Sequence, residues 1–320
     1  MHGARNRFAR PANSGWFWRG LARVAPIVVA AGALTAAETP APHSLLLDGT
    51  RAGSSVIAVG ERGTILRSSD NARTWQAAAS PALATLTGVS FAPDGVHGWA
   101  VGHDALILTT SDGGRTWTKQ YQAENLQDSF LDVLAIDAQR VFAVGAYGLF
   151  VATADGGRSW VRRKIIEDDY HLNRISRGPA GTLYLAGEHG TLLRSADGEK
   201  WTPIPSPYDG SFYGILPLDA RTLLAHGLRG RVYRSADDGA AWQPVATPEP
   251  VLVATAVRLK SNLVVLAGNS HRFFLSRDQG QSIVAAPASL DGAVAELVEL
   301  PDGGILALGE AGATVIEAPK

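Results

Sequence analysis

The segment Thr110-Ser-Asp-Gly-Gly-Arg-Thr-Trp117 recurs in altered form along the 320-residue chain. The other copies are residues 68–75, 153–160, 195–201, 235–242 and 276–283. In each copy an Asp follows a Ser or Thr by two positions. An Asp in such a place accepts hydrogen bonds from backbone N–H groups of its own turn. Gly in the next positions allows the positive φ that a tight turn needs. Each copy therefore predicts a turn between two short strands.

A second feature keeps the same period. Seven glycines each end an apolar run of β-branched and aliphatic residues, with spacings of 40 to 43 residues. They are Gly60, Gly102, Gly145, Gly187, Gly227, Gly268 and Gly309. Another apolar run precedes each glycine strand by about ten residues, and a further run follows it, which is the pattern of strands bounded by turns.

Four short strands repeated at about 40 residues are typical of a β-propeller blade. The sequence therefore predicts an all-β fold, a seven-bladed β-propeller with one domain over residues 38–320. The blades are expected near residues 44–80, 86–121, 130–163, 171–204, 212–246, 252–285 and 293–317. The last copy ends too early for a fourth strand, so residues 38–43 are the candidate for the strand that closes the ring. Closure of this kind would cover an exposed sheet edge.

We predict a structural role for the repeated Asp and Trp residues. Each Asp would hold its turn, and each indole would be buried between neighbouring blades. Five of the six Trp residues after position 37 lie in these segments, which favours packing over ligand stacking. The predicted structural residues are Asp70, Trp75, Asp112, Trp117, Asp155, Trp160, Asp197, Trp201, Asp237, Trp242 and Asp278.

The first 37 residues have the pattern of a secretory signal. Five Arg and no acidic residue precede a short stretch rich in Ala, Val and Gly, which ends in small residues before Glu38. We expect cleavage after residue 37 and export to the periplasm or the exterior; the alternative is an uncleaved membrane anchor. Loss of the five Arg would change the net charge from −1 to −6. The chain has no Cys, which excludes disulfides and Cys-based metal or thiol chemistry.

The repeated segment is similar to the Asp-box, the bacterial neuraminidase repeat. Its fuller form, seen in Ala100-Val-Gly102 followed by Leu106-Ile-Leu and Asp112-Gly-Gly, resembles the photosystem II stability/assembly factor family. The resemblance covers residues 44–317. It implies a propeller exported to the thylakoid lumen or periplasm, a non-catalytic scaffold that docks on a membrane protein complex or exporter. The chain departs from the pattern in Asn71-Ala72, in the shortened fourth copy and in Ile283.

In a propeller, the turns after the glycines and the links between blades lie on one face, opposite the Asp segments. This face varies between copies and carries exposed basic, aromatic and acidic residues, which suit a protein–protein surface. The candidate partner-binding residues are Arg62, His103, Asp104, Tyr147, His189, Arg229, His271, Arg272, Arg162, Arg163 and Tyr170. Because His103, His189 and His271 stand on alternate blades, we expect no metal site, and no cofactor is expected.

Two other classes remain open. A sialidase-like glycan hydrolase would need converging arginines or paired carboxylates, for which Asp104, Asp168, Asp169 and Glu188 are candidates. A carbohydrate-binding propeller would need exposed aromatic platforms. We expect no enzyme, no nucleic-acid partner given the near-neutral charge, a monomer, and at most peripheral contact with a membrane.

Overall fold

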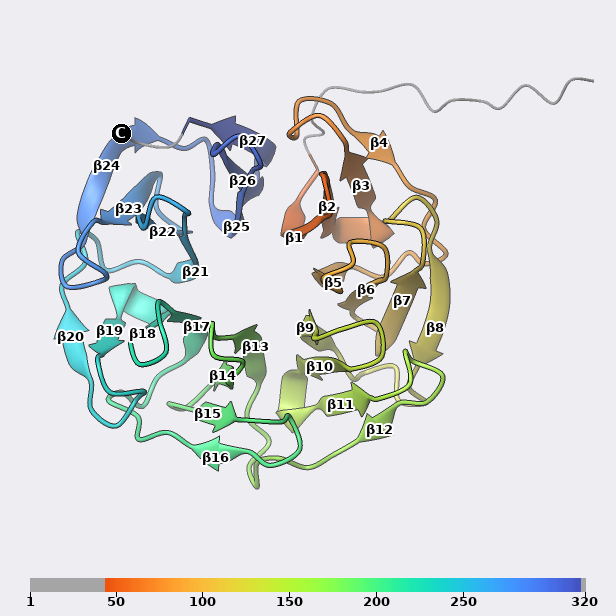
Figure 1. The fold of residues 1–320 in the computed structure, drawn as a ribbon, viewed down its shortest axis with the longest axis horizontal. Coiled ribbons are helices and arrows are strands. Elements are labelled where there is room, and N and C mark those ends of the chain that lie inside the picture. The colour runs from red at the N-terminus through yellow and green to blue at the C-terminus, as the bar shows by residue number, and fades with distance from the viewer. Residues whose placement is uncertain (1–43, 318–320) are drawn as a thin grey trace, which may run out of the picture. The chain divides into compact units, whose positions relative to one another are not determined.

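The computed structural model describes residues 44–317 of the chain, so the predicted signal peptide and the closing strand expected at 38–43 lie outside the described residues. Residues 44–317 form seven antiparallel sheets around one axis (Figure 1). The predicted fold class, a seven-bladed β-propeller, is confirmed. Within this range, no helix is long and apolar enough to span a bilayer.

The strands follow the repeat of the sequence. Blades 1 and 2 contain β1 (Leu46–Ala52), β2 (Ser55–Gly60), β3 (Ile65–Ser68), β4 (Gln76–Ala77), β5 (Leu86–Phe91), β6 (Gly98–Gly102), β7 (Leu106–Thr110) and β8 (Thr118–Gln122). Blades 3 and 4 contain β9 (Phe130–Ala135), β10 (Val141–Gly145), β11 (Phe150–Thr153), β12 (Val161–Arg162), β13 (Leu172–Arg177), β14 (Leu183–Gly187), β15 (Leu192–Ser195) and β16 (Thr202–Pro203). Blades 5 to 7 contain β17 (Phe212–Pro217), β18 (Leu223–Gly227), β19 (Val232–Ser235), β20 (Gln243–Val245), β21 (Val253–Arg258), β22 (Val264–Gly268), β23 (Arg272–Ser276), β24 (Val284–Ser289), β25 (Val294–Glu299), β26 (Ile305–Gly309) and β27 (Gly312–Ile316).

Each blade is a meander whose first strand lies nearest the axis. Six sheets have four strands, while blade 7 has three among the described residues. Because the strands alternate in direction, the turns after the second strands share one face with the links between blades. We call it the Gly-turn face. The Asp segments turn on the other face, the Asp-turn face.

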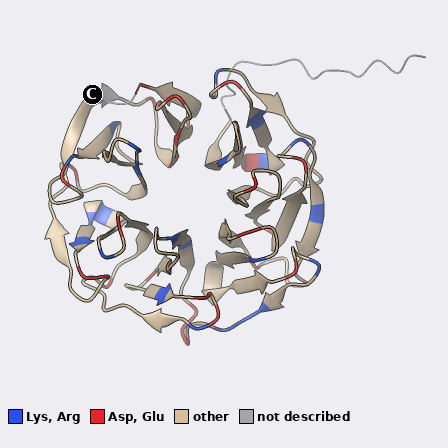
Figure 2. Ribbon diagram, viewed as in Figure 1, with Lys and Arg blue, Asp and Glu red and all other residues tan. Residues whose placement is uncertain are grey.

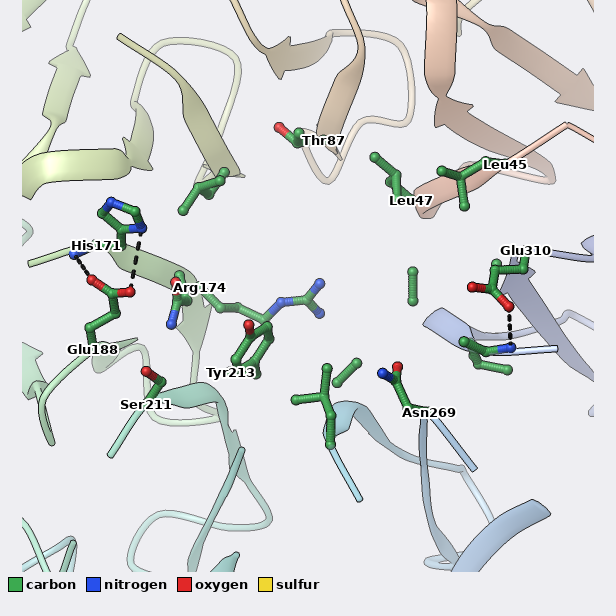
Figure 3. Close-up of a pocket in the computed structure, with 18 residues that line it drawn as sticks. Leu45, Leu47, Thr87, His171, Arg174, Glu188, Ser211, Tyr213, Asn269 and Glu310 are labelled. Carbon is green, nitrogen blue, oxygen red and sulfur yellow. Dashed lines mark hydrogen bonds and ion pairs between the residues drawn. The ribbon is translucent and has the colours of Figure 1, made fainter. Parts of the chain in front are cut away.

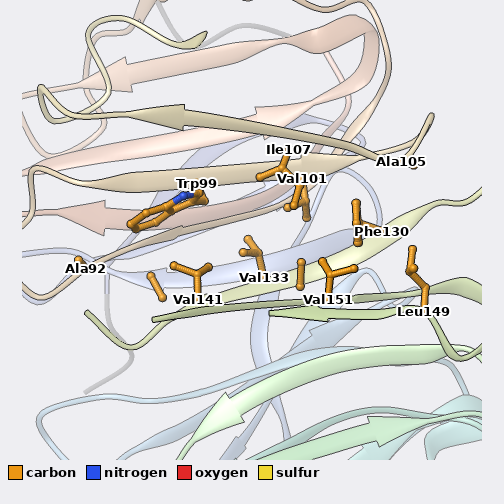
Figure 4. Packing of buried hydrophobic residues seen from close by; sticks show 12 residues of the cluster. Ala92, Trp99, Val101, Ala105, Ile107, Phe130, Val133, Val141, Leu149 and Val151 are labelled. Atoms are coloured by element: carbon orange, nitrogen blue, oxygen red, sulfur yellow. The ribbon is translucent and has the colours of Figure 1, made fainter. Parts of the chain in front are cut away.

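The hydrophobic core lies between the blades rather than within one layer. Seven clusters of buried side chains each join two adjacent sheets. Between blades 2 and 3, Trp99 and Ile107 face Phe130 and Val151 (Figure 4). The second strand of every blade is buried on both faces, which explains its continuous apolar sequence.

The six Asp segments form turns with the same hydrogen bonds, and we call them the Asp turns. In blade 1, Asp70 Oδ1 accepts the Thr74 N–H at 2.9 Å and the Ser68 hydroxyl at 2.8 Å. Equivalent backbone N–H bonds to Oδ1 measure 2.9 or 3.0 Å in the other five turns. Asn71 and Ala72 adopt the positive φ that Gly-Gly adopts elsewhere, so the departure in sequence leaves the turn unchanged.

We expect the Asp turns to make the fold sensitive to acid. Hydrogen bonds from Thr74 and Ser68 outweigh burial and lower the pKa of Asp70 to about 2, and the pKa of Asp112 is likewise about 2. A folded-state pKa below the unfolded value stabilises the fold above the unfolded pKa, and this contribution is lost as pH falls. The thermal midpoint, followed by circular dichroism, should fall between about pH 4 and pH 2.

The matched variant for this experiment is Asp112→Asn, which has no titrating carboxyl in its turn. Its midpoint should change less with pH over the same range than that of the parent chain. Parallel curves for the two proteins would contradict the role given to the carboxylate.

Candidate protein-binding face

Five of the predicted partner-binding residues occupy one structural position on the Gly-turn face. Each stands second in a four-residue turn and has a left-handed backbone. They are Arg62 (φ 55°), Asp104 (φ 58°), Tyr147 (φ 56°), His189 (φ 50°) and Arg229 (φ 57°). The residue that follows each also has positive φ, which is the signature of a type I′ hairpin turn.

This position favours Asn, Asp or Gly, and a left-handed backbone strains other side chains. Tyr147 nevertheless occupies it with 62% of its surface exposed. A large aromatic side chain at a strained, exposed position adds little to stability. Its presence there therefore suits contact with another molecule.

Tyr147, Tyr170 and His189 lie together at the junction of blades 3 and 4. The Tyr147 ring meets the His171 ring edge-on with centroids 4.8 Å apart. The Tyr170 ring stacks on the His189 ring at 4.4 Å. His171 was not among the predicted residues; its Nδ1 lies 3.5 Å from a carboxylate oxygen of Glu188. We call these four rings the Tyr–His cluster.

The other predicted residues do not join this cluster. Arg62, His103, Arg229, His271 and Arg272 are exposed on blades 1, 2, 5 and 6. Basic and acidic residues are interspersed along the strands and turns of all the blades (Figure 2).

Arg162 and Arg163 lie at the outer edge of blade 3. Arg162 Nη1 is 2.7 Å from Asp128 Oδ2, and Arg163 Nη1 is 2.7 Å from Glu199 Oε2. The first pair ties the outer edge of blade 3 to the link before this blade, and the second ties it to the Asp turn of blade 4. Both arginines already have acidic partners within the chain.

A pocket opens on the Gly-turn face beside the Tyr–His cluster, and we call it the mouth pocket. Its volume is about 470 Å³. The first residues of the inner strands line it, with both leucines and polar side chains around its wall (Figure 3). Leu45 and Leu47 lie opposite Tyr213, and the Arg174 side chain reaches the middle of the view. The pocket offers an apolar wall and a few polar groups, as ligand sites commonly do.

Three glutamates near this face have a structural role. Each follows the glycine of its blade, and its carboxylate accepts the backbone N–H of a residue just before the inner strand. The bonds are Leu45 N–H to Glu61 at 3.3 Å, His171 N–H to Glu188 at 3.0 Å and Ala293 N–H to Glu310 at 3.2 Å. Glu188, one of the candidate catalytic carboxylates, is thus already engaged by its own backbone and by His171.

Deeper along the axis, every inner strand has a bulge after its first residue. The residue that resumes the register occupies the same place in all seven blades. These residues are Asp48, Gly88, Asp132, Arg174, Gly214, Thr255 and Glu296. Four are charged, and we call Asp48, Asp132, Arg174 and Glu296 the channel ion cluster.

Arg174 connects blade 4 to blade 7 across the axis. Its Nη1 lies 2.5 Å from Glu296 Oε2, and its Nε lies 4.0 Å from Asp132 Oδ2. Burial alone would lower the pKa of Arg174, but Glu296, Asp132 and Asp48 outweigh burial and raise it. The guanidinium is therefore charged at every accessible pH.

The carboxylates of the cluster also bind neighbouring strands. Asp132 accepts the Ile175 N–H of the next blade at 2.9 Å, and Asp48 accepts the Val89 N–H at 2.6 Å. Burial raises the pKa of Asp132 to about 6, against the opposing effect of Arg174. Burial, together with Glu296, also raises the pKa of Asp48 well above its usual range.

The cluster does not match the predicted requirements of a sialidase. Arg174 and Arg177 are the arginines that line the channel among the described residues, whereas a sialidase needs several converging on one carboxylate. The carboxylates accept hydrogen bonds from backbone N–H groups, so their role is to hold neighbouring strands together. Within residues 44–317, no three His, Cys, Asp or Glu side chains lie close enough together to hold a metal ion.

Comparison with known proteins gives one family. A family model described as photosynthesis system II assembly factor YCF48 matches residues 68–128 and 120–314. A search of curated proteins found no significant match.

Several solved structures are similar to the chain. One described as YCF48 bound to D1 peptide is 20% identical with a TM-score of 0.73, covering 89% of this chain and 97% of that one. YCF48 from Cyanidioschyzon merolae is 18% identical with a TM-score of 0.72, covering 88% and 98%. The WD40 β-propeller domain of Doa1 is 13% identical with a TM-score of 0.68, covering 89% and 96%. At these identities the similarity establishes the fold alone.

Proposed function

Because the chain belongs to the photosystem II assembly factor YCF48 family, we propose that it is a non-catalytic scaffold that binds a membrane protein on its Gly-turn face. The observation that carries this proposal is that the partly exposed Tyr–His cluster and the mouth pocket lie side by side on one face. A structure of the family is described as bound to a D1 peptide. For this chain, the proposed ligand is a segment of a membrane protein complex or transporter.

The chemistry of the face fits such a segment. Tyr side chains give a large contact area at low conformational cost, and they are enriched at protein interfaces. Tyr147 supplies such a contact at the rim of the junction between blades 3 and 4. The leucines of the mouth pocket would accept an apolar side chain, while Asn173 and Asn269 in the same lining can hydrogen-bond a peptide backbone.

The proposal includes no bond-making step. The carboxylates near the axis hold backbone N–H groups or Arg174, and their removal from those partners would cost stability. Export through the leader at residues 1–37, a periplasmic or lumenal location, peripheral contact with the membrane and a monomeric state complete the proposal. The reversible binding of a partner would be the whole activity.

Tyr147→Asn tests the docking site with little structural cost. Asn favours the left-handed backbone at this turn position, which offsets the lost contact with His171, so unfolding free energy should change by less than about 1 kcal/mol. Affinity for the membrane complex should fall about tenfold, since buried Tyr side chains are frequent hot spots. Cosedimentation of the purified chain with native membranes, over a range of chain concentrations, measures this.

Arg73→Ala is the matched control, because Arg73 is exposed in an Asp turn on the other face. It should bind the complex as the parent chain does. Equal binding by Tyr147→Asn and the parent chain would exclude the junction of blades 3 and 4 as the docking site. Turnover of a glycan by the purified chain would instead favour the hydrolase alternative.

A further inference from the structure

The channel contains a second cavity on the far side of Arg174 from the mouth pocket. It has a volume of about 280 Å³ and is lined by the ends of the inner strands, toward the Asp-turn face. We call it the lower chamber. Its lining includes Asp48, Asp132, Glu296 and His226. The proposed docking on the Gly-turn face makes no use of these groups.

The lower chamber has more buried acidic than basic groups. Asp48, Asp132 and Glu296 are at most 7% exposed, and the half-buried Arg174 is the cation that pairs with them. Arg177 also lines the chamber, but it is an exposed residue, so water and salt screen its charge. When the three carboxyls are ionised they outnumber this one guanidinium, which favours the entry of a further positive charge.

His226 adds a hydrogen-bond acceptor to this chamber. It is 2% exposed, and its Nδ1 lies 3.0 Å from the carbonyl oxygen of Val253. Since a carbonyl can only accept, Nδ1 carries the proton and donates it. Burial lowers the pKa of His226 to about 4, so the ring is neutral near pH 7 and Nε2 keeps its lone pair.

That lone pair has no partner in the part of the chain that the structure describes. His226 makes its one described hydrogen bond through Nδ1. Asp48 is in a similar state, because Oδ2 accepts the Val89 N–H while Oδ1 has no bond among residues 44–317. Both side chains line the chamber. A ligand that satisfies the imidazole and the ionised carboxylate of Asp48 must donate hydrogen bonds.

We infer that the lower chamber is a binding site for an organic cation that carries an ammonium or guanidinium group. Such a group combines positive charge with several N–H donors, which match carboxylate and imidazole acceptors. A chamber of 280 Å³ admits a small amine or one long basic side chain. The cation is either a free amine or the side chain of a Lys or Arg from another protein.

Calorimetric titration of the full chain with two probes tests the inference and separates the sources. The probes are methylguanidinium and a capped glycine peptide with one central Lys. At about pH 8, where the buried carboxyls are most ionised, at least one probe should bind saturably with one site per chain. Binding of methylguanidinium alone indicates a free cation, and preference for the peptide indicates a basic side chain.

Asp48→Asn should weaken binding of the bound probe about tenfold, which corresponds to the loss of one charge-assisted contact. The matched control is Glu310→Gln, a carboxylate of the mouth pocket, which should bind the probe unchanged. If Asp48→Asn does not fold, the ¹⁵N resonance of His226 Nε2 in the parent chain replaces it. That resonance should shift on addition of the probe.

Absence of saturable binding by both probes would overturn the inference. So would binding that Asp48→Asn leaves unchanged, or a His226 Nε2 resonance that does not respond. None of these results bears on the Gly-turn face, whose test uses Tyr147→Asn and a membrane complex.

Discussion

Trp75→Ala should destabilise the protein by about 4 kcal/mol, the largest loss expected from truncating a single indole in the chain. Trp75 is completely buried. It belongs to the cluster that joins blade 1 to blade 7, together with Val298, Leu300 and Leu308. This seam differs from the other six, because blades 1 and 7 are not consecutive in the chain.

No chain segment connects the two blades at this seam within residues 44–317. Blade 7 contributes three strands in the described residues, and an Asn71 amide donates to Asp302 across the seam at 2.9 Å. Loss of the indole leaves a cavity between blades 1 and 7. Because these blades are not consecutive in the chain, no short link holds them together around that cavity. The cost should therefore lie near the upper part of the range for buried aromatic residues.

Trp242→Ala is the matched control, since Trp242 occupies the same repeat position in blade 5 but is only half-buried. Its indole N–H donates to the Pro205 carbonyl at 2.9 Å, and its loss should cost about 1–2 kcal/mol. Equilibrium urea unfolding of both variants measures the difference. Equal losses of unfolding free energy in the two variants would contradict the special importance of the seam between blades 1 and 7.

Arg174→Met should lower the free energy of unfolding by about 3 kcal/mol near pH 8, somewhat less than Trp75→Ala. The change leaves Glu296 and Asp132 without their cationic partner in the channel. Removal of one partner of a buried ion pair costs more than the pair contributes, because the remaining charge stays desolvated.

This loss should depend on pH in a defined direction. The pKa of Asp132 is already raised to about 6 by burial, and removal of Arg174 raises it further. The folded state then binds more protons than the unfolded state, so stability increases as pH falls. The deficit of Arg174→Met relative to the parent chain should shrink between about pH 8 and pH 5.

Arg174→Met combined with Asp132→Asn and Glu296→Gln should recover most of the lost stability at about pH 8, since two of the buried charges are removed. Urea unfolding at both pH values provides the comparison. A deficit that is the same at both, with no recovery in the triple variant, would show that the ion cluster does not carry the effect.

The sequence was sufficient to predict the architecture, because the residues that mark the repeat period have strict requirements for local backbone conformation. Seven strand-ending glycines and six Asp turns mark the same place in each repeat, so the blade count follows from them. The three strands that blade 7 has among residues 44–317 also match the strands expected from its repeat.

The channel was harder to predict. The charged positions lie inside inner strands, as in Leu46-Leu-Asp48 and Leu172-Asn-Arg174, where a polar residue looks like ordinary strand alternation. An alignment of the seven inner strands would have placed Asp48, Asp132, Arg174 and Glu296 in one column. Their pairing across the axis would still have been hidden, because it depends on the closure of the ring.

The sequence predicted only in part that Tyr147, Tyr170 and His189 lie close together. Each was predicted for the Gly-turn face, but their ring contacts depend on the way the link before blade 4 folds back over the turn of blade 3. His171 comes directly after this link and completes the cluster. The repeat pattern of the sequence does not single out His171.

The central claim is that a membrane protein binds the Gly-turn face at the junction of blades 3 and 4. Photo-crosslinking from a benzoylphenylalanine at position 147, with position 73 on the Asp-turn face as control, tests it most directly. We predict that position 147 crosslinks to one subunit of a membrane complex in native membranes and that position 73 does not. Crosslinks from position 73 alone, or from neither position while the chain cosediments with the membranes, would contradict the claim.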